Sequence, residues 1–181
     1  MSRRRYCLAA LLLLLTMLPS QQAHADDAII GDVVMTAIPV TAFAVAFFKD
    51  DAEGEKQWLR NLAANQIITT AARLGFNQTS WGERPNGHPY GFPSGHVAFA
   101  GSGAAFLSER YGWHYGLPAW IGTAYVAYNR VDNRSHRWRD AIASGAIAFG
   151  VGKLFVTPEN ATHIAPTIGP DWIGLRWHRS W

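Results

Sequence analysis

Apolar residues recur along this chain with helical rather than strand spacing, in blocks that polar loops separate. Residues 29–48 are mostly apolar and predict one or two buried helices. A transmembrane span is the alternative, but Asp32 and Pro39 interrupt the stretch. From residue 57 to 74 apolar side chains return every three or four positions, which predicts a further helix that ends at Gly75.

The second half of the chain predicts three more helices. They are expected at residues 95–110, 119–129 and 138–156, with loops at 77–91, 113–118 and 130–137. Strand signals are scarce outside the C-terminal tail, where Trp172, Trp177 and Trp181 are expected to cover the core or, alternatively, to dock at a membrane surface. The pattern predicts an all-α, single-domain bundle of roughly five or six helices.

The first 25 residues have the pattern of a signal peptide. A basic segment, Arg3-Arg4-Arg5, precedes an apolar segment at 8–18, and Ala23-His24-Ala25 forms a small-x-small cleavage site. Residues 1–25 are therefore expected to be removed, which leaves a domain at 26–181 that is exported to the periplasm. Cys7, the only cysteine, lies in the segment removed, so the mature chain is expected to have no disulfide.

Charge changes the picture once the leader is set aside. The whole chain carries a net charge of +3, but the leader holds three arginines and no acidic residue, so 16 basic residues become 13 against 13 acidic ones. A neutral domain is a poor candidate for nucleic-acid binding, which needs a basic surface. No His-Glu-x-x-His or paired-cysteine element occurs in the sequence, which argues against a zinc hydrolase.

One candidate for chemistry is a turn that leads into the helix predicted at 95–110. Its sequence is Pro93-Ser94-Gly95-His96, in which Ser94 suits the N-cap position and His96 falls in the first turn. The start of a helix presents free N–H groups and a positive dipole to an anion. An imidazole beside such an anion site suggests phosphoryl chemistry, although a turn of this kind, taken alone, is more often a plain helix entry.

A second candidate lies where the loop at 130–137 meets the last helix. His136 and Asp140 are four residues apart, which on a helix lets the carboxylate accept a hydrogen bond from one ring nitrogen and leaves the other free to act as nucleophile or base. Arg130, six residues before His136, is a planar donor for phosphate oxygens. The alternative is an ordinary surface His–Asp pair.

Arg84-Pro85 adds a guanidinium on a rigid turn, and the three motifs together resemble a known family. The chain is similar to the type 2 phosphatidic acid phosphatase superfamily, which includes bacterial class A acid phosphatases, lipid phosphatases, glucose-6-phosphatase and vanadium haloperoxidases. The family pattern is Lys-x6-Arg-Pro, then Pro-Ser-Gly-His, then Ser-Arg-x5-His-x3-Asp. The resemblance spans about 65 residues, up to Asp140.

The resemblance assigns a role to each motif residue. His136 would attack phosphorus to give a phosphohistidine, and Asp140 would orient it. His96 would protonate the leaving oxygen and later activate water. The phosphoryl oxygens would be held by the remaining groups, which are Arg84, Arg130, Ser94 and the amide of Gly95. This chemistry requires no metal and no cofactor.

The chain departs from the family pattern at the first motif. The position of the expected lysine falls on Asn77, which has no charge, and Arg73 is the alternative cation if residues 80–83 are an insertion. Glu83 adds a carboxylate next to the first-motif arginine, and Asn129 stands where serine is commonest.

The sequence therefore predicts an exported, metal-independent phosphatase acting on phosphate monoesters or pyrophosphates, with lipid phosphates favoured by the apolar stretch at 29–48 and the tryptophan-rich tail. The expected partners are a phosphorylated substrate and a membrane surface, and not nucleic acid. Two alternatives remain, namely a vanadate-dependent haloperoxidase and a non-catalytic phosphate-binding envelope protein. The identity of the ester and the oligomeric state are left open.

Overall fold

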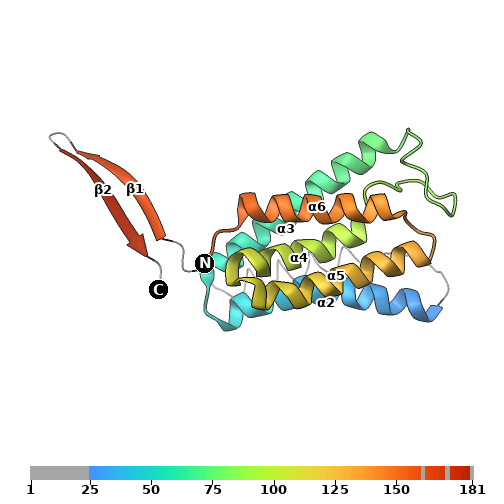
Figure 1. Ribbon diagram of the computed structural model, residues 1–181, viewed down its shortest axis with the longest axis horizontal. Coiled ribbons are helices and arrows are strands. Elements are labelled where there is room, and N and C mark those ends of the chain that lie inside the picture. The colour runs from blue at the N-terminus through green and yellow to red at the C-terminus, as the bar shows by residue number, and fades with distance from the viewer. Residues whose placement is uncertain (1–24, 160–161, 170–171, 180–181) are drawn as a thin grey trace.

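The computed structural model describes residues 25–159, 162–169 and 172–179. Among these residues, five helices form a bundle (Figure 1): α2 (Ala25–Phe48), α3 (Ala52–Phe76), α4 (Gly95–Tyr111), α5 (Trp113–Asp132) and α6 (Trp138–Phe155). Two strands follow, β1 (Thr162–Gly169) and β2 (Trp172–Arg179), which pair antiparallel with Thr162 opposite Arg179. The predicted helical bundle is confirmed. The predicted signal peptide, apart from Ala25, and the side chains of the tail tryptophans lie outside what the structure describes.

Helix α4 is the centre of the bundle, because it packs against all four other helices (Figure 1). Every residue from Val97 to Ser108 is buried. Small residues make this close packing feasible: a Cβ at Gly103 would lie 2.7 Å from the Cα of Pro39 in α2, and one at Gly101 would lie 2.9 Å from the Cβ of Ala148 in α6. Neither position has room for a side chain, so α4 is held tightly from both sides.

Several helix boundaries differ from the sequence prediction, among them the start of α3, which is Ala52 and not residue 57. Helix α3 passes through Gly75 and ends at Phe76, and α5 already begins at Trp113, with Pro118 inside it, so the predicted loop at 113–118 is wrong. Proline near the start of a helix removes only one internal hydrogen bond, and the exposed first turn lets water satisfy the freed carbonyl. At its other end α5 extends to Asp132, which places Arg130 in the last helical turn.

The apolar stretch at 29–48 forms part of one continuous helix, α2, and only one of its faces is buried. Met35, Ile38, Ala42 and Ala46 belong to the core, whereas large side chains on the other face are exposed, among them Ile29, Val33 and Phe48. The expectation of a buried helix is therefore wrong for this outer face. By length and composition alone, Ile29–Phe48 is long and apolar enough to cross a membrane.

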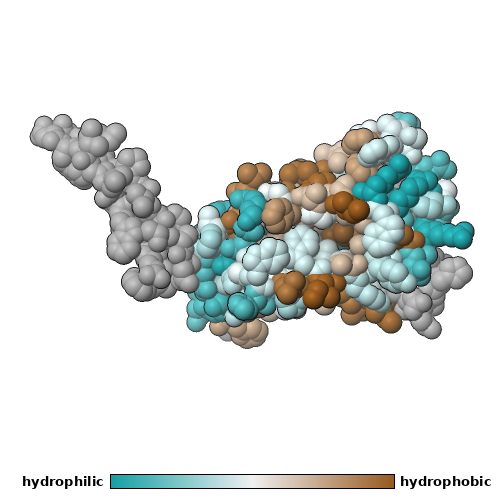
Figure 2. Space-filling model, in the orientation of Figure 1, coloured by the Kyte–Doolittle hydropathy of each residue, from teal (hydrophilic) through white to brown (hydrophobic). Residues whose placement is uncertain are grey.

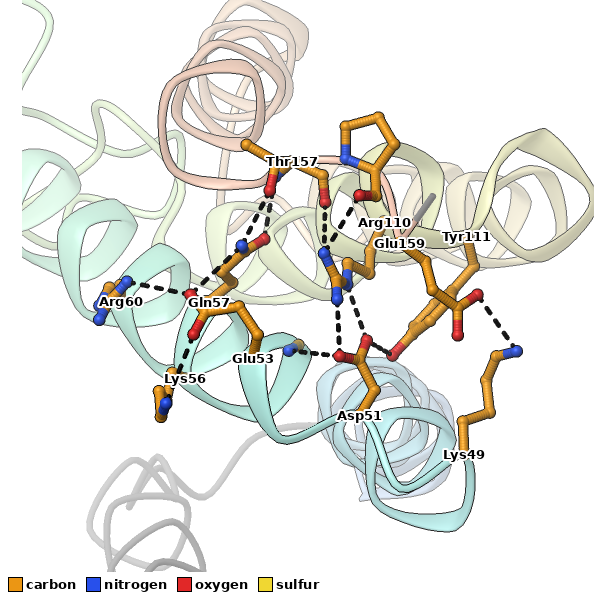
Figure 3. Close-up of polar contacts among 12 residues, drawn as sticks. Lys49, Asp51, Glu53, Lys56, Gln57, Arg60, Arg110, Tyr111, Thr157 and Glu159 are labelled. Atoms are coloured by element: carbon orange, nitrogen blue, oxygen red, sulfur yellow. Dashed lines mark hydrogen bonds and ion pairs between the residues drawn. The ribbon is translucent and has the colours of Figure 1, made fainter. Parts of the chain in front are cut away.

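A buried ion pair closes the end of the bundle where α2 turns into α3 (Figure 3). Asp51 caps α3 by accepting from the Gly54 amide at 2.9 Å, and it also accepts from Arg110 at 2.6 and 2.7 Å and from the Tyr111 hydroxyl at 2.8 Å. Arg110 in turn donates to the carbonyl of Thr157, beyond α6, at 2.9 Å. These bonds join the start of α3, the end of α4 and the end of α6.

Candidate active site

The three sequence motifs meet at the opposite end of the bundle, where α3 and α5 end and α4 and α6 begin (Figure 1). This arrangement follows from the topology, since antiparallel neighbours bring the end of one helix beside the start of the next. The residues placed here are Arg73 in the last turn of α3, Arg84 in the loop that follows, Ser94 to His96 at the start of α4, Arg130 in the last turn of α5, and His136 and Asp140 at the start of α6.

Two hydrogen bonds from or to the backbone of Ser94 join the second motif to α6, which carries the end of the third motif. The amide of Ser94 donates to the carbonyl of Asp140 at 3.2 Å, and the hydroxyl of Ser144 donates to the carbonyl of Ser94 at 2.8 Å. Ser94 occupies the predicted N-cap position of α4, but its hydroxyl does not cap the helix. That hydroxyl is buried and has no hydrogen-bond partner among the described residues, so it is available to a ligand.

His136 is almost fully buried, and its ring is oriented by a backbone carbonyl. Its Nδ1 lies 2.7 Å from the carbonyl oxygen of Gly91 but 3.8 Å from Oδ2 of Asp140. The predicted ring-to-carboxylate hydrogen bond is therefore not formed, because His136 precedes α6 instead of sharing a helical face with Asp140. Since a carbonyl only accepts, Nδ1 carries the proton, and Nε2 of the neutral ring keeps its lone pair.

Asp140 has a different immediate partner. Its Oδ2 accepts from the amide of Arg137 at 2.7 Å, which caps the start of α6.

Burial lowers the pKa of His136, and the positive charge of Arg84 adds to this, while Asp140 and the Gly91 carbonyl act in the opposite direction. The resulting pKa below the usual 6.5 keeps His136 neutral near pH 7, which is the form a nucleophile needs.

His96 faces a carboxylate that the sequence did not single out. Its Nε2 lies 3.6 Å from Oδ1 of Asp32, and the same oxygen accepts a hydrogen bond from Nη2 of Arg130. Asp32 comes from α2, far away in the sequence, where it only interrupts an apolar stretch. The signal that could have identified it is the isolated carboxylate itself, since an acidic residue in such a stretch is costly without a partner.

Three guanidinium groups surround the histidines. Burial lowers the pKa of His96 well below its usual value, and the charges of Arg130, His136, Arg84 and Arg73 lower it further. The Nε atoms of all three arginines are buried and have no hydrogen-bond partner among the described residues. Burial and the charges of Arg73 and Arg130 also lower the pKa of Arg84. Buried like charges with unused donors favour an anionic ligand, whose charge offsets their repulsion.

The structure distinguishes between the two candidates for the first-motif cation. A Cβ at Gly95 would lie 3.0 Å from Nη1 of Arg73, so this guanidinium adjoins the helix start that carries the second motif. Asn77 instead uses its Oδ1 to accept from the amide of Tyr90 at 2.9 Å, which closes the loop. Glu83, which the sequence placed beside the phosphate, is an exposed loop residue.

Within the described part of the chain, no three His, Cys, Asp or Glu side chains form a group that could hold a metal.

Two histidines, three arginines and the start of α4 lie together at one end of the helical bundle. The family model described as PAP2 superfamily matches residues 61–161, more than half of the chain. The chain therefore belongs to the PAP2 superfamily, as the motifs predicted, and it is a phosphatase.

A solved structure shares this fold. The chain resembles the crystal structure of LpxE from Aquifex aeolicus with a TM-score of 0.53 and 18% sequence identity, over 81% of this chain and 92% of that one. At this identity the likeness supports the helical fold alone. No curated protein sequence matches the chain.

Proposed function

We propose that this protein is an exported, metal-independent phosphatase that cleaves phosphate monoesters or pyrophosphates of lipids through a phosphohistidine at His136. The observation that carries the proposal is the set of buried donors without partners around two histidines, namely the Nε atoms of Arg73, Arg84 and Arg130 and the hydroxyl of Ser94. A phosphoryl group supplies the acceptor oxygens that such a set of donors needs.

In the first step, Nε2 of His136 attacks phosphorus and the bond to the leaving oxygen breaks. The hydrogen bond from Nδ1 to the Gly91 carbonyl holds the ring for this attack and stabilises the positive charge that develops on it. His96 gives its proton to the leaving oxygen. In the second step His96 takes a proton from water, which attacks the phosphohistidine and releases phosphate and neutral His136.

Fixed donors hold the equatorial oxygens throughout both steps. The free N–H groups at the start of α4 point along the helix dipole, so the amide of Gly95 is an oxyanion donor beside the Ser94 hydroxyl. Arg84 and Arg130 supply planar guanidinium donors, and Arg73 supplies the positive charge of the missing lysine. Because these groups are already positioned, little reorganisation accompanies the development of charge in the transition state.

Exposed apolar side chains favour a lipid substrate. Figure 2 shows such side chains gathered in patches over the helices, while the end that carries the site loops is mainly hydrophilic. Among the described residues, the exposed large apolar side chains include Leu117 and Ile121 on α5, Ile142 and Leu154 on α6, and those on the outer face of α2. Apolar patches of this kind are typical of surfaces that meet membranes or protein partners. Export to the periplasm follows from the predicted signal peptide.

An activity assay tests this function. The mature protein is expected to hydrolyse p-nitrophenyl phosphate and, faster, phosphatidic acid in detergent micelles, with full activity in the presence of EDTA. Loss of activity in EDTA that added metal restores would contradict the metal-independent mechanism. Tight binding of vanadate without hydrolysis of either substrate would indicate a non-catalytic phosphate-binding protein instead.

Arg73→Ala tests the assignment of the first-motif cation. A hydrogen bond between charged groups contributes about 1.5–3 kcal/mol, so we expect kcat/KM to fall about 10- to 100-fold and inhibition by phosphate to weaken similarly. Arg73→Lys should recover part of this loss, because lysine keeps the charge. Asn77→Ala is the matched comparison and should affect thermal stability more than phosphate inhibition. The reverse order of the two alanine variants would assign the position to Asn77.

A further inference from the structure

Asp32 lies in the candidate site although it belongs to none of the three motifs. Its Oδ1 contacts both Nη2 of Arg130 and, at 3.6 Å, Nε2 of His96. Asp32 is half-exposed, whereas the Arg130 side chain it contacts is buried. An acidic group beside the arginines of an anion site opposes the binding of phosphate, so its position calls for a compensating role.

We propose that Asp32 is a positioning residue whose carboxylate favours the protonated form of His96, the general acid of the reaction. The inference rests on the proposed function, because it presupposes that His96 protonates the leaving oxygen. A distance of 3.6 Å is too long for a hydrogen bond. The carboxylate charge therefore stabilises the imidazolium, while the Nε2–H remains free to turn toward the leaving oxygen.

The charges around His96 explain why such a group is needed. Positive or proton-bearing groups face it from four elements: Arg73 of α3, Arg84 of the following loop, Arg130 of α5 and His136 before α6. All of them disfavour the imidazolium, and so does burial. Asp32 of α2 is the carboxylate that the structure places within 4 Å of the ring among the described residues.

The proton balance of the first step is simple. The bond from His136 Nε2 to phosphorus forms, the bond from phosphorus to the leaving oxygen breaks, and the proton of His96 passes to that oxygen. Asp32 itself neither gains nor loses a proton. Arg130 benefits from the same contact, because Asp32 fixes one end of its guanidinium while the buried Nε remains available to the phosphoryl group.

The test compares two leaving groups in the Asp32→Asn protein. Nitrophenolate leaves without much protonation, whereas the alkoxide of hexyl phosphate must be protonated as it leaves. We expect Asp32→Asn to lower kcat/KM about 10- to 100-fold for hexyl phosphate and less than about threefold for p-nitrophenyl phosphate. Asp32→Glu should restore part of the loss. Glu53→Gln, which removes an exposed carboxylate at the other end of the bundle, should match wild type with both substrates.

The pH profile provides a second readout. Removing the carboxylate makes the imidazolium less stable, so the pKa of His96 falls and the protonated acid is lost at lower pH. The basic limb of kcat/KM for hexyl phosphate should therefore move down by about one pH unit in Asp32→Asn. Ionisation of the substrate is common to both proteins and cancels in their ratio.

Three results would overturn the inference. Equal losses with both substrates would show that Asp32 acts through Arg130 or through the fold, and an unchanged profile would show that it plays no part. Higher activity of Asp32→Asn would show that the carboxylate competes with phosphate. Each of these requires an active wild-type protein. Wild-type protein that hydrolyses neither substrate overturns the proposed function, and the inference with it.

Discussion

Replacing His136 by alanine is expected to lower kcat/KM at least about 10⁴-fold with every substrate, because removal of a nucleophile leaves only transition-state binding. The side chain is buried, and its Nδ1 is held by the Gly91 carbonyl, so Nε2 is the ring nitrogen that remains for the attack. The measurement is steady-state hydrolysis of p-nitrophenyl phosphate by purified protein. This good leaving group also separates the nucleophile from the acid, since loss of His96 should reduce kcat/KM for it much less.

Two controls show whether this loss is chemical. His114→Ala changes an exposed histidine at the start of α5, at the opposite end of the bundle, and should leave the rate unchanged. Vanadate should still bind to the His136→Ala protein, more weakly, because the arginines and the start of α4 remain. Activity of His136→Ala within tenfold of wild type would reject the proposed nucleophile.

The largest effect on stability is expected at Asp51, far from the chemistry. Asp51→Asn keeps a residue that can cap α3 but leaves the guanidinium of Arg110 without its counter-charge, and both side chains of this pair are less than 10% exposed. Breaking one side of a buried pair costs about 3–5 kcal/mol, so the free energy of unfolding should fall by at least about 3 kcal/mol. Chemical denaturation monitored by circular dichroism measures this directly.

The pH range of this contribution follows from the pKa of Asp51. Burial alone would raise it, but hydrogen bonds from Arg110, the Gly54 amide and Tyr111 hold it below the usual 3.8. A lowered pKa in the folded state means that the stabilisation is fully present at neutral pH and is lost as the pH falls through that pKa. At neutral pH, Asp51→Asn that unfolds at the same denaturant concentration as wild type would contradict the buried pair.

The fold was largely predictable because helical periodicity depends only on neighbouring residues. The spacing of apolar residues located four of the five described helices approximately, and failed at Pro118, the sixth residue of α5, because the carbonyl that this proline leaves without a partner lies in the exposed first turn. The extent of burial was harder to predict. One face of α2 is apolar yet exposed, and hydrophobicity alone does not reveal what covers a helix.

The site was predictable wherever its residues lie in motifs, and unpredictable where it depends on tertiary contacts. Asp32 reaches Arg130 from a position 98 residues away, and no local pattern links the two. The carbonyl of Gly91 orients His136, and a backbone group has no sequence signature. The hydrogen bond predicted between His136 and Asp140 fails for the same reason. It required both residues to lie on one helix, but α6 begins only after His136.

If the phosphoryl group passes through His136, the phosphohistidine intermediate can be trapped. Protein mixed briefly with ³²P-labelled p-nitrophenyl phosphate and quenched in alkali should retain label, because phosphohistidine survives alkali and is lost in acid. We expect label on the peptide that contains His136, with none in His136→Ala and more in a variant of His96 that hydrolyses the intermediate slowly. Two results would contradict a phosphohistidine at His136: substrate hydrolysis by wild-type protein with no label trapped on wild type or on the His96 variant, or label on another residue.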